Sequence, residues 1–206
     1  SVYAESSEDE LLEMMNYIKK RKNEEMMGGT MRRGKRENKN LARQAAKYLR
    51  KSDGPRVAVF EVNGFDTHAA QGGVDGSHTK SLVEMDEIIN NLKDNLQEAY
   101  KDTIILTVTE FGRTIKQNGG NGTEHGYGTA IFMAGGLLKK SQVHTDWPGL
   151  KRKELYDGRD LNATIDARSV YASAMSTVFD LDFKRIQKDV FWGEDLQNLS
   201  DKLFKA

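Results

Sequence analysis

The feature that most constrains the fold is a run of apolar residues at positions 57–62, with the sequence Val-Ala-Val-Phe-Glu-Val. Its first four residues are apolar on both faces, which is typical of a central strand in a parallel sheet that helices cover on either side. Two further runs, at 103–109 and 130–134, are also rich in β-branched or apolar residues. The sequence therefore predicts three strands.

Helices are expected between and around these strands. The clearest lies at 80–100, where apolar residues recur at helical spacing: Leu82, Met85, Ile88, Ile89, Leu92 and Leu96. Four more helices are expected at 7–27, 38–51, 166–180 and 195–204. The order strand, helix, strand, loop, strand, helix predicts an α/β fold with a mostly parallel sheet flanked by helices.

The composition limits the kinds of function. A length of 206 residues suffices for one domain with a sizeable core, and we expect a helical N-terminal segment at 1–52 and an α/β domain at 53–206. The 31 basic and 31 acidic residues cancel, which gives no support for nucleic-acid or membrane-surface binding as the main role. The basic run at 31–36 lacks interleaved aromatic residues, so we interpret it as a solvated loop. No apolar run approaches the roughly 18 residues of a membrane span.

The absence of Cys excludes a thiol nucleophile, a disulfide and a Cys-based zinc site. Candidate ligands must therefore come from other residues, and in parallel sheets ligands bind beyond the carboxyl ends of the strands. The first predicted strand is followed by Asp66 and His68, which point the same way if the chain stays extended. A carboxylate beside an imidazole suits zinc or another divalent transition metal. A polar loop with a capping Asp is the alternative.

Two other segments carry candidate site residues. Glu110 and Arg113 follow the second predicted strand. Arg113 could bind phosphate or sulfate, although a surface ion pair with Glu110 is equally compatible with the spacing. Five glycines surround His125 in the segment 119–128. A His with so little steric cover suits a metal or substrate contact, and a flexible loop with an incidental His is the alternative.

With these segments in this order, the sequence resembles the family called domain of unknown function 1501, a branch of the alkaline-phosphatase-like superfamily. The resemblance extends from about residue 40 to the C-terminus, and we expect it to correspond to the second half of a typical family member. The matching pieces are 64–68 with Gln71, 110–114, 122–126, the pair Gly135 and Gly136, 146–150, and Asp166 with Arg168.

The resemblance implies an alkaline-phosphatase-like fold and a metal-dependent site for the hydrolysis of phosphate or sulfate esters. It implies one or two divalent ions, most often zinc, with manganese and calcium as alternatives. The implied metal ligands are Asp66, His68, Glu110 and His125, and Arg113 would offset negative charge in catalysis. Phe111 and Glu124 depart from the family pattern, which often has His and usually has Asp at these places. Family habit also implies an exported or periplasmic protein.

Superfamily enzymes carry their Ser or Thr nucleophile in the N-terminal half, which we expect this chain to lack. Thr67 is the nearest candidate in the sequence. Two functions therefore stay open: a hydrolase of anionic esters in the complete protein, and a non-catalytic binding or structural module that keeps the fold. The missing initiator Met also fits a proteolytic remnant, whose exposed sheet edge a second copy of the chain would cover as a homodimer.

Overall fold

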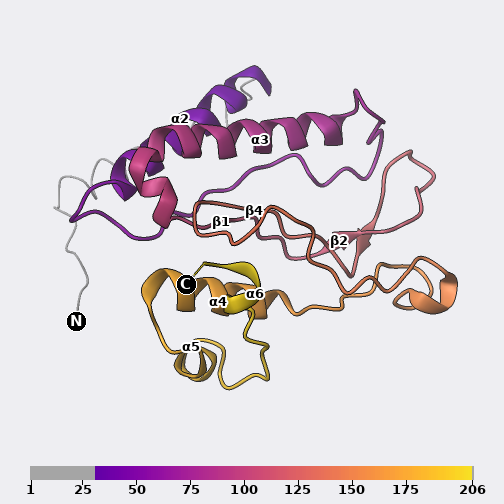
Figure 1. Cartoon of the computed structure of the whole chain (residues 1–206). Coiled ribbons are helices and arrows are strands. Elements are labelled where there is room, and N and C mark those ends of the chain that lie inside the picture. The colour runs from indigo at the N-terminus through magenta and orange to yellow at the C-terminus, as the bar shows by residue number, and fades with distance from the viewer. Residues whose placement is uncertain (1–30, 206) are drawn as a thin grey trace. The chain divides into compact units, whose positions relative to one another are not determined.

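The computed structural model describes residues 31–205, so the helix expected at 7–27 lies outside the described residues. These residues form two compact units (Figure 1). Within the described range, unit 1 consists of 31–63 and 81–99, and unit 2 consists of 64–80 and 100–205. All candidate site residues lie in unit 2.

Unit 1 is built on two helices, α2 (Met31–Leu49) and the larger part of α3 (Ser77–Leu96). Residues four apart share one face of a helix, which explains why Ala42 and Ala46 are both fully buried. On α3 the same spacing buries a row of larger residues, Ile88, Leu92 and Leu96. Polar contacts tie the two helices together, because Asn38 Nδ2 donates to Glu84 Oε1 at 2.7 Å and Lys39 pairs with Glu87 at 3.1 Å.

Two expectations for this unit are wrong. The basic run at 31–36 is the first part of α2 and not a loop. The segment 57–62 forms no strand, and Val57 and Val59 are 61% and 91% exposed. An apolar, β-branched run becomes a strand only where a neighbouring strand completes its hydrogen bonds, and the described part of unit 1 supplies none.

Unit 2 contains two small antiparallel sheets. In one sheet β1 (Ile105–Leu106) pairs with β4 (Met133–Ala134), and in the other β2 (Gly112–Arg113) pairs with β3 (His125–Gly126). The predicted mostly parallel sheet flanked by helices is therefore wrong. Parallel neighbours need a long crossover, usually a helix, whereas the segment between β1 and β4 contains only β2, β3 and loops.

Unit 2 also contains three helices, α4 (Ala167–Phe179), α5 (Phe183–Asp189) and α6 (Ser200–Leu203), and its core consists of two clusters. Val170 and Ala174 of α4 pack with Phe204, and Leu106 and Met133 of the sheet cover this cluster. A second cluster joins Ala172 of α4 to α5. Two short 3-10 helices, η1 (Gln97–Asp102) and η2 (Arg152–Glu154), complete the elements.

Local sequence explains both ends of α4. Asp166 caps its N-terminus by accepting the backbone N–H of Arg168 at 2.8 Å, and Asp180 adopts a left-handed conformation at its C-terminus. The helices expected at 38–51, 80–100, 166–180 and 195–204 are confirmed as α2, α3, α4 and, in a shorter form, α6. None of the described helices combines the length and the apolar character needed to cross a bilayer.

Candidate metal centre

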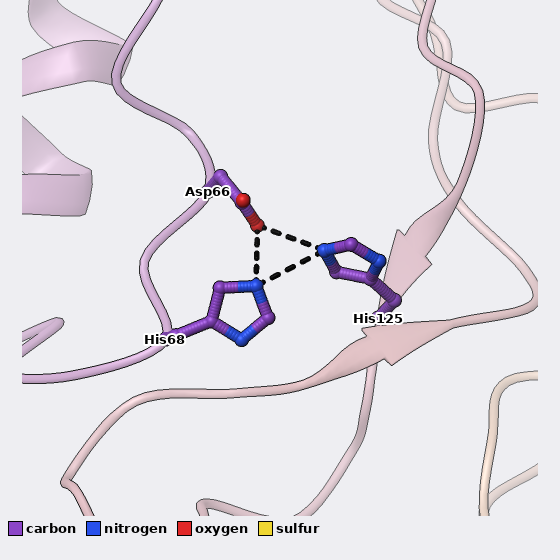
Figure 2. Close-up of side chains that lie close together, drawn as sticks. All are labelled: Asp66, His68 and His125. Atoms are coloured by element: carbon purple, nitrogen blue, oxygen red, sulfur yellow. Dashed lines mark hydrogen bonds and ion pairs between the residues drawn. The ribbon is translucent and has the colours of Figure 1, made fainter.

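Asp66, His68 and His125 bring three ligand atoms together in unit 2 (Figure 2). Asp66 Oδ1 lies 2.9 Å from His68 Nε2 and 3.1 Å from His125 Nε2, and the two Nε2 atoms are 3.0 Å apart. Atoms that bind one zinc ion at about 2.0–2.2 Å lie about 3 Å or slightly more from one another. The triangle therefore has the dimensions of one face of a metal coordination shell.

Asp66 and His68 lie on a loop with tight local turns. Thr67 N donates to Phe65 O at 3.0 Å, and His68 N donates to Asp66 O at 3.2 Å, which are bonds between residues two apart. The loop is thus more folded than the extended chain expected from the sequence. Nevertheless, Asp66 and His68 direct their ligand atoms to the same point.

A second loop fixes this first one in place through backbone hydrogen bonds. Ala70 N donates to Gly120 O at 2.8 Å, Gln71 N donates to Asn121 O at 2.9 Å, and Thr123 N donates to Thr67 O at 3.1 Å. This pairing carries the second loop directly into β3, whose first residue is His125. The two loops therefore bring residues that are 57 positions apart in the sequence into one centre.

The glycines of the second loop permit this close approach. A Cβ at Gly122 would lie 2.3 Å from the carbonyl carbon of His68 and 2.5 Å from Thr67 O. A Cβ at Gly126 would lie 2.6 Å from Arg113 O across the β2–β3 ladder. The glycine-rich composition around His125 thus serves tight packing and not flexibility.

Arg113 lies opposite His125 in the β2–β3 register and holds Asp66. Its Nη1 donates to Asp66 Oδ1 at 2.5 Å, its Nε donates to Thr123 Oγ1 at 3.0 Å, and its Nη2 donates to Thr123 O. The side chain is only 20% exposed. Arg113 therefore orients the carboxylate of Asp66 and balances its charge.

Glu124 performs a similar task for His68. Its Oε2 lies 3.0 Å from His68 Nδ1, and its Oε1 accepts a hydrogen bond from Asn118 Nδ2. A carboxylate at Nδ1 favours the tautomer with the proton on that nitrogen, which leaves the lone pair of Nε2 directed at the centre. His125 is held differently, because the ring of Phe111 stacks on it with centroids 3.8 Å apart.

The surroundings keep both carboxylates ionised. The hydrogen bond from Arg113, supported by His125 and His68, lowers the pKa of Asp66 below its ordinary value. The hydrogen bond from Asn118, followed by that with His68, lowers the pKa of Glu124. Asp66 is therefore charged at neutral pH, as a metal ligand must be.

Among the predicted site residues, Asp66, His68, His125 and Arg113 lie together, whereas Glu110 does not belong to the group. β1 ends at Leu106, so Glu110 lies beyond the strand end on which its prediction depended, and it is exposed. The supporting roles of Glu124 and Asn118 were not predicted. A signal for Asn118 exists in the sequence, since an Asn ahead of several glycines is typical of a turn: its Oδ1 accepts from the N–H groups of Gly120 and Gly122, both at 2.9 Å.

Thr67, the nearest candidate nucleophile in the sequence, is buried, and its hydroxyl donates to Gln71 Oε1 at 2.9 Å. The same Gln71 oxygen accepts the hydroxyl of Thr123 at 2.9 Å. This small network joins the two loops behind the ligands. It assigns Thr67 a structural role in the site.

Comparison with known proteins gives one result. The family model described as "Protein of unknown function (DUF1501)" matches residues 5–188, a range that includes all residues of the candidate metal centre. No curated protein and no solved structure matches the chain. The resemblance to this family is thereby confirmed, over a range that begins well before residue 40.

Proposed function

The chain belongs to the DUF1501 family, and from this starting point we propose that it holds a divalent metal ion for the hydrolysis of phosphate or sulfate esters. The convergence of Asp66 Oδ1, His68 Nε2 and His125 Nε2 within 3.1 Å carries the proposal. The motif resemblance to the alkaline-phosphatase-like superfamily supports the reaction class. The two small antiparallel sheets do not contribute to this proposal.

The donor set favours zinc. Two imidazole nitrogens and one carboxylate oxygen suit zinc better than calcium, which prefers oxygen ligands alone, and manganese is intermediate. Three protein ligands leave at least one position open, which is typical of catalytic zinc sites. Glu110 stays a sequence prediction for a further ligand.

The residues around the ion would each have a defined task. A bound divalent ion would act as a Lewis acid on an ester oxygen and lower the pKa of a bound water molecule. Arg113 holds Asp66 in place, Glu124 fixes the tautomer of His68, and Phe111 orients the ring of His125. Arg113 uses three of its five N–H groups, which leaves two for an anionic ester.

A non-catalytic metal-binding module is the second candidate. One observation favours it: the hydroxyl of Thr67, next to both ligands of the first loop, is buried and bonded to Gln71. Within this module the ion would stabilise the junction of the two loops and no ester bond would be cleaved.

Calorimetric titration of EDTA-treated protein with Zn²⁺ tests the metal site. We expect one ion per chain and a loss of affinity of about 100-fold or more in His125→Ala, because one of three ligands is removed. His144→Ala is the matched control. Within the described residues, the ring nitrogens of His144 have a hydrogen-bond contact with Gln142 and lie outside the candidate centre. Equal affinity of wild type and His125→Ala, or no binding of Zn²⁺ or Mn²⁺, would sink the proposal.

The reaction class needs a separate assay. Zinc-loaded protein should hydrolyse 4-nitrophenyl phosphate or 4-nitrophenyl sulfate, and His125→Ala should not. Metal binding without turnover of either ester supports the non-catalytic module. The variant Glu110→Gln tests whether Glu110 is a metal ligand. Weaker zinc binding than in the wild type would indicate that it is, and unchanged zinc binding would show that it is not.

A further inference from the structure

A cavity of about 390 Å³ lies in unit 2, apart from the three ligand residues. Its lining consists of Lys116, Leu150, Arg152, Leu155 and Gly158. Lys116, Leu150 and Arg152 are exposed, so the cavity opens to solvent. The volume falls in the range of small-molecule sites, about 300–1,000 Å³, and the lining combines two apolar side chains with two cations.

The two cations have no acidic partner. In the part of the chain that the structure describes, neither Lys116 nor Arg152 takes part in an ion pair. Two of the three acids of the same loop are bonded elsewhere, and the third, Asp157, acts electrostatically on Arg159. Glu154 Oε2 accepts the backbone N–H of Lys151 at 2.8 Å, and both carboxylate oxygens of the buried Asp160 accept from Arg159.

The loop that carries Arg152 is tightly built. Gly158 has a φ of +64°, and a Cβ there would lie 3.2 Å from Arg152 Cγ, so the stem of Arg152 lies against this glycine. Tyr156 and Asp160 form a bridge across the turn, and the buried Asp160 anchors it. The cavity is thus preformed, which reduces the entropy that a ligand must overcome on binding.

Two short links, each through one hydrogen-bonded residue, join the cavity lining to the backbone of the candidate metal centre. Lys116 follows Thr114 by two residues, and Thr114 exchanges hydrogen bonds with the backbone of Glu124 at 2.9 and 3.1 Å. Gly158 precedes Arg159, whose Nη2 donates to the carbonyl oxygen of His125 at 3.3 Å. Two residues of the cavity lining, Lys116 and Gly158, are therefore one or two positions along the chain from groups bonded to the backbone of the centre.

We propose that this cavity binds a second acidic group of the substrate together with the apolar body that carries it. Arg152 and Lys116 would pair with a carboxylate, sulfonate or phosphate, and Leu150 and Leu155 would contact the apolar part. The substrate class of the proposed hydrolase then narrows to esters with an apolar skeleton and a further negative charge. This substrate class rests on the proposed hydrolase function. Binding of an amphiphilic anion in the cavity, by contrast, requires neither the metal ion nor hydrolysis.

The cavity is tested first without metal. EDTA-treated protein is titrated calorimetrically with naphthalene-2-sulfonate, an amphiphilic anion that contains no ester bond. We expect one site per chain and a dissociation constant about tenfold or more higher in Lys116→Met and in Arg152→Met, since each loses a charged hydrogen bond. Lys153→Met is the matched control, because Lys153 is an exposed cation of the same turn that does not line the cavity.

Circular dichroism spectra and melting temperatures of the four proteins show that the variants remain folded. Unchanged binding in both cavity variants, no binding by the wild type, or equal binding of uncharged 2-naphthalenemethanol would overturn the proposal. An equal loss in Lys153→Met would also overturn it, because the effect would then be general charge attraction.

A second assay separates this proposal from the proposed function. Zinc-loaded protein is given 2-naphthyl phosphate and the phosphate ester of 6-hydroxy-2-naphthoic acid, and we expect a KM about tenfold lower for the carboxylated ester in the wild type but equal KM values in Arg152→Met. Sulfonate binding without hydrolysis of either ester refutes the hydrolase and leaves the cavity standing. Hydrolysis of both esters with equal KM values and no sulfonate binding refutes the cavity and leaves the hydrolase standing.

Discussion

At the scale of single residues, the candidate site consists of ligands and of the residues that hold them. Asp66 is fixed by Arg113, and His68 is fixed by Glu124. Such supporting residues usually change metal affinity by about 10–100-fold when they are replaced. Glu124 is the informative one, because it makes the contact that sets the tautomer of His68.

Replacing Glu124 by Gln should lower zinc affinity by about tenfold or more. The amide can donate a hydrogen bond to His68 Nδ1, which favours the tautomer whose Nε2 carries the proton and no longer points a lone pair at the centre. Competition between the protein and a fluorescent zinc chelator measures the affinity. Glu124→Asp, which keeps the carboxylate, should bind zinc more tightly than Glu124→Gln. The reverse order contradicts the role of this carboxylate.

The clustering of Asp66, His68 and His125 could be predicted from the sequence, whereas the residues that hold them could not. Asp66 and His68 lie two residues apart, and His125 lies among glycines, so local pattern and family motif both identified them. The contacts of His68 with Glu124 and of Asp66 with Arg113 join residues 56 and 47 positions apart. Such contacts depend on the path of both loops, which no local pattern specifies.

At the scale of elements, the junction of the two loops depends on one close approach. A side chain at Gly122 would collide with the backbone of Thr67 and His68, whereas a Cβ at Gly119 would meet nothing within 4 Å. We therefore expect Gly122→Ala to destabilise the protein by about 1–3 kcal/mol and to weaken zinc binding, as overpacking against backbone does. Urea unfolding at neutral pH measures the stability. Gly119→Ala is the matched control, and an equal effect of both substitutions would show that the close approach does not matter.

The N-terminus of α4 makes a prediction about pH. Hydrogen bonds from Arg168 lower the pKa of Asp166 below its unfolded value. The charge of Asp166 therefore stabilises the fold fully above about pH 4, and this contribution is lost as the pH falls through the lower, folded pKa. Asp166→Asn keeps the capping oxygen but not the charge. Its deficit in unfolding free energy should be present at pH 7 and vanish near pH 2, as measured by urea unfolding at both values.

Asp166→Ala removes the capping oxygen as well as the charge. It should lower the unfolding free energy by about 0.5–2 kcal/mol at pH 7, and part of this deficit should remain at pH 2. A deficit of Asp166→Asn that does not change with pH would mean that the Asp166–Arg168 pair contributes no stability.

Helices and strands differed in how well the sequence predicted them. The apolar rows of α3 and the cap and periodicity of α4 are local signals, and both helices are present at the expected places. Strands need partners, and partner choice is not local. The run at 57–62 therefore has strand composition but no strand, and the runs at 103–109 and 130–134 form only a two-residue antiparallel pair.

At the scale of the whole molecule, the site prediction identified residues that do lie together but gave the wrong reason. Asp66, His68, Glu110 and Arg113 were selected because strand ends in a parallel sheet share one edge, and the described residues contain no such sheet. His125 was selected for the glycines around it. The residues that lie together are joined by the pairing of two loops and by the β2–β3 ladder, all within unit 2. Glu110 was chosen by the same strand-end rule. Neither the loop pairing nor the β2–β3 ladder includes it, and it lies outside the group.

X-ray absorption at the zinc edge of the zinc-loaded chain tests the central claim most directly. The account predicts two imidazole nitrogens at about 2.0–2.1 Å, together with carboxylate or water oxygen, and one imidazole fewer in His125→Ala. A zinc shell with fewer than two imidazoles, or one that is unchanged in His125→Ala, would contradict the metal centre formed by Asp66, His68 and His125.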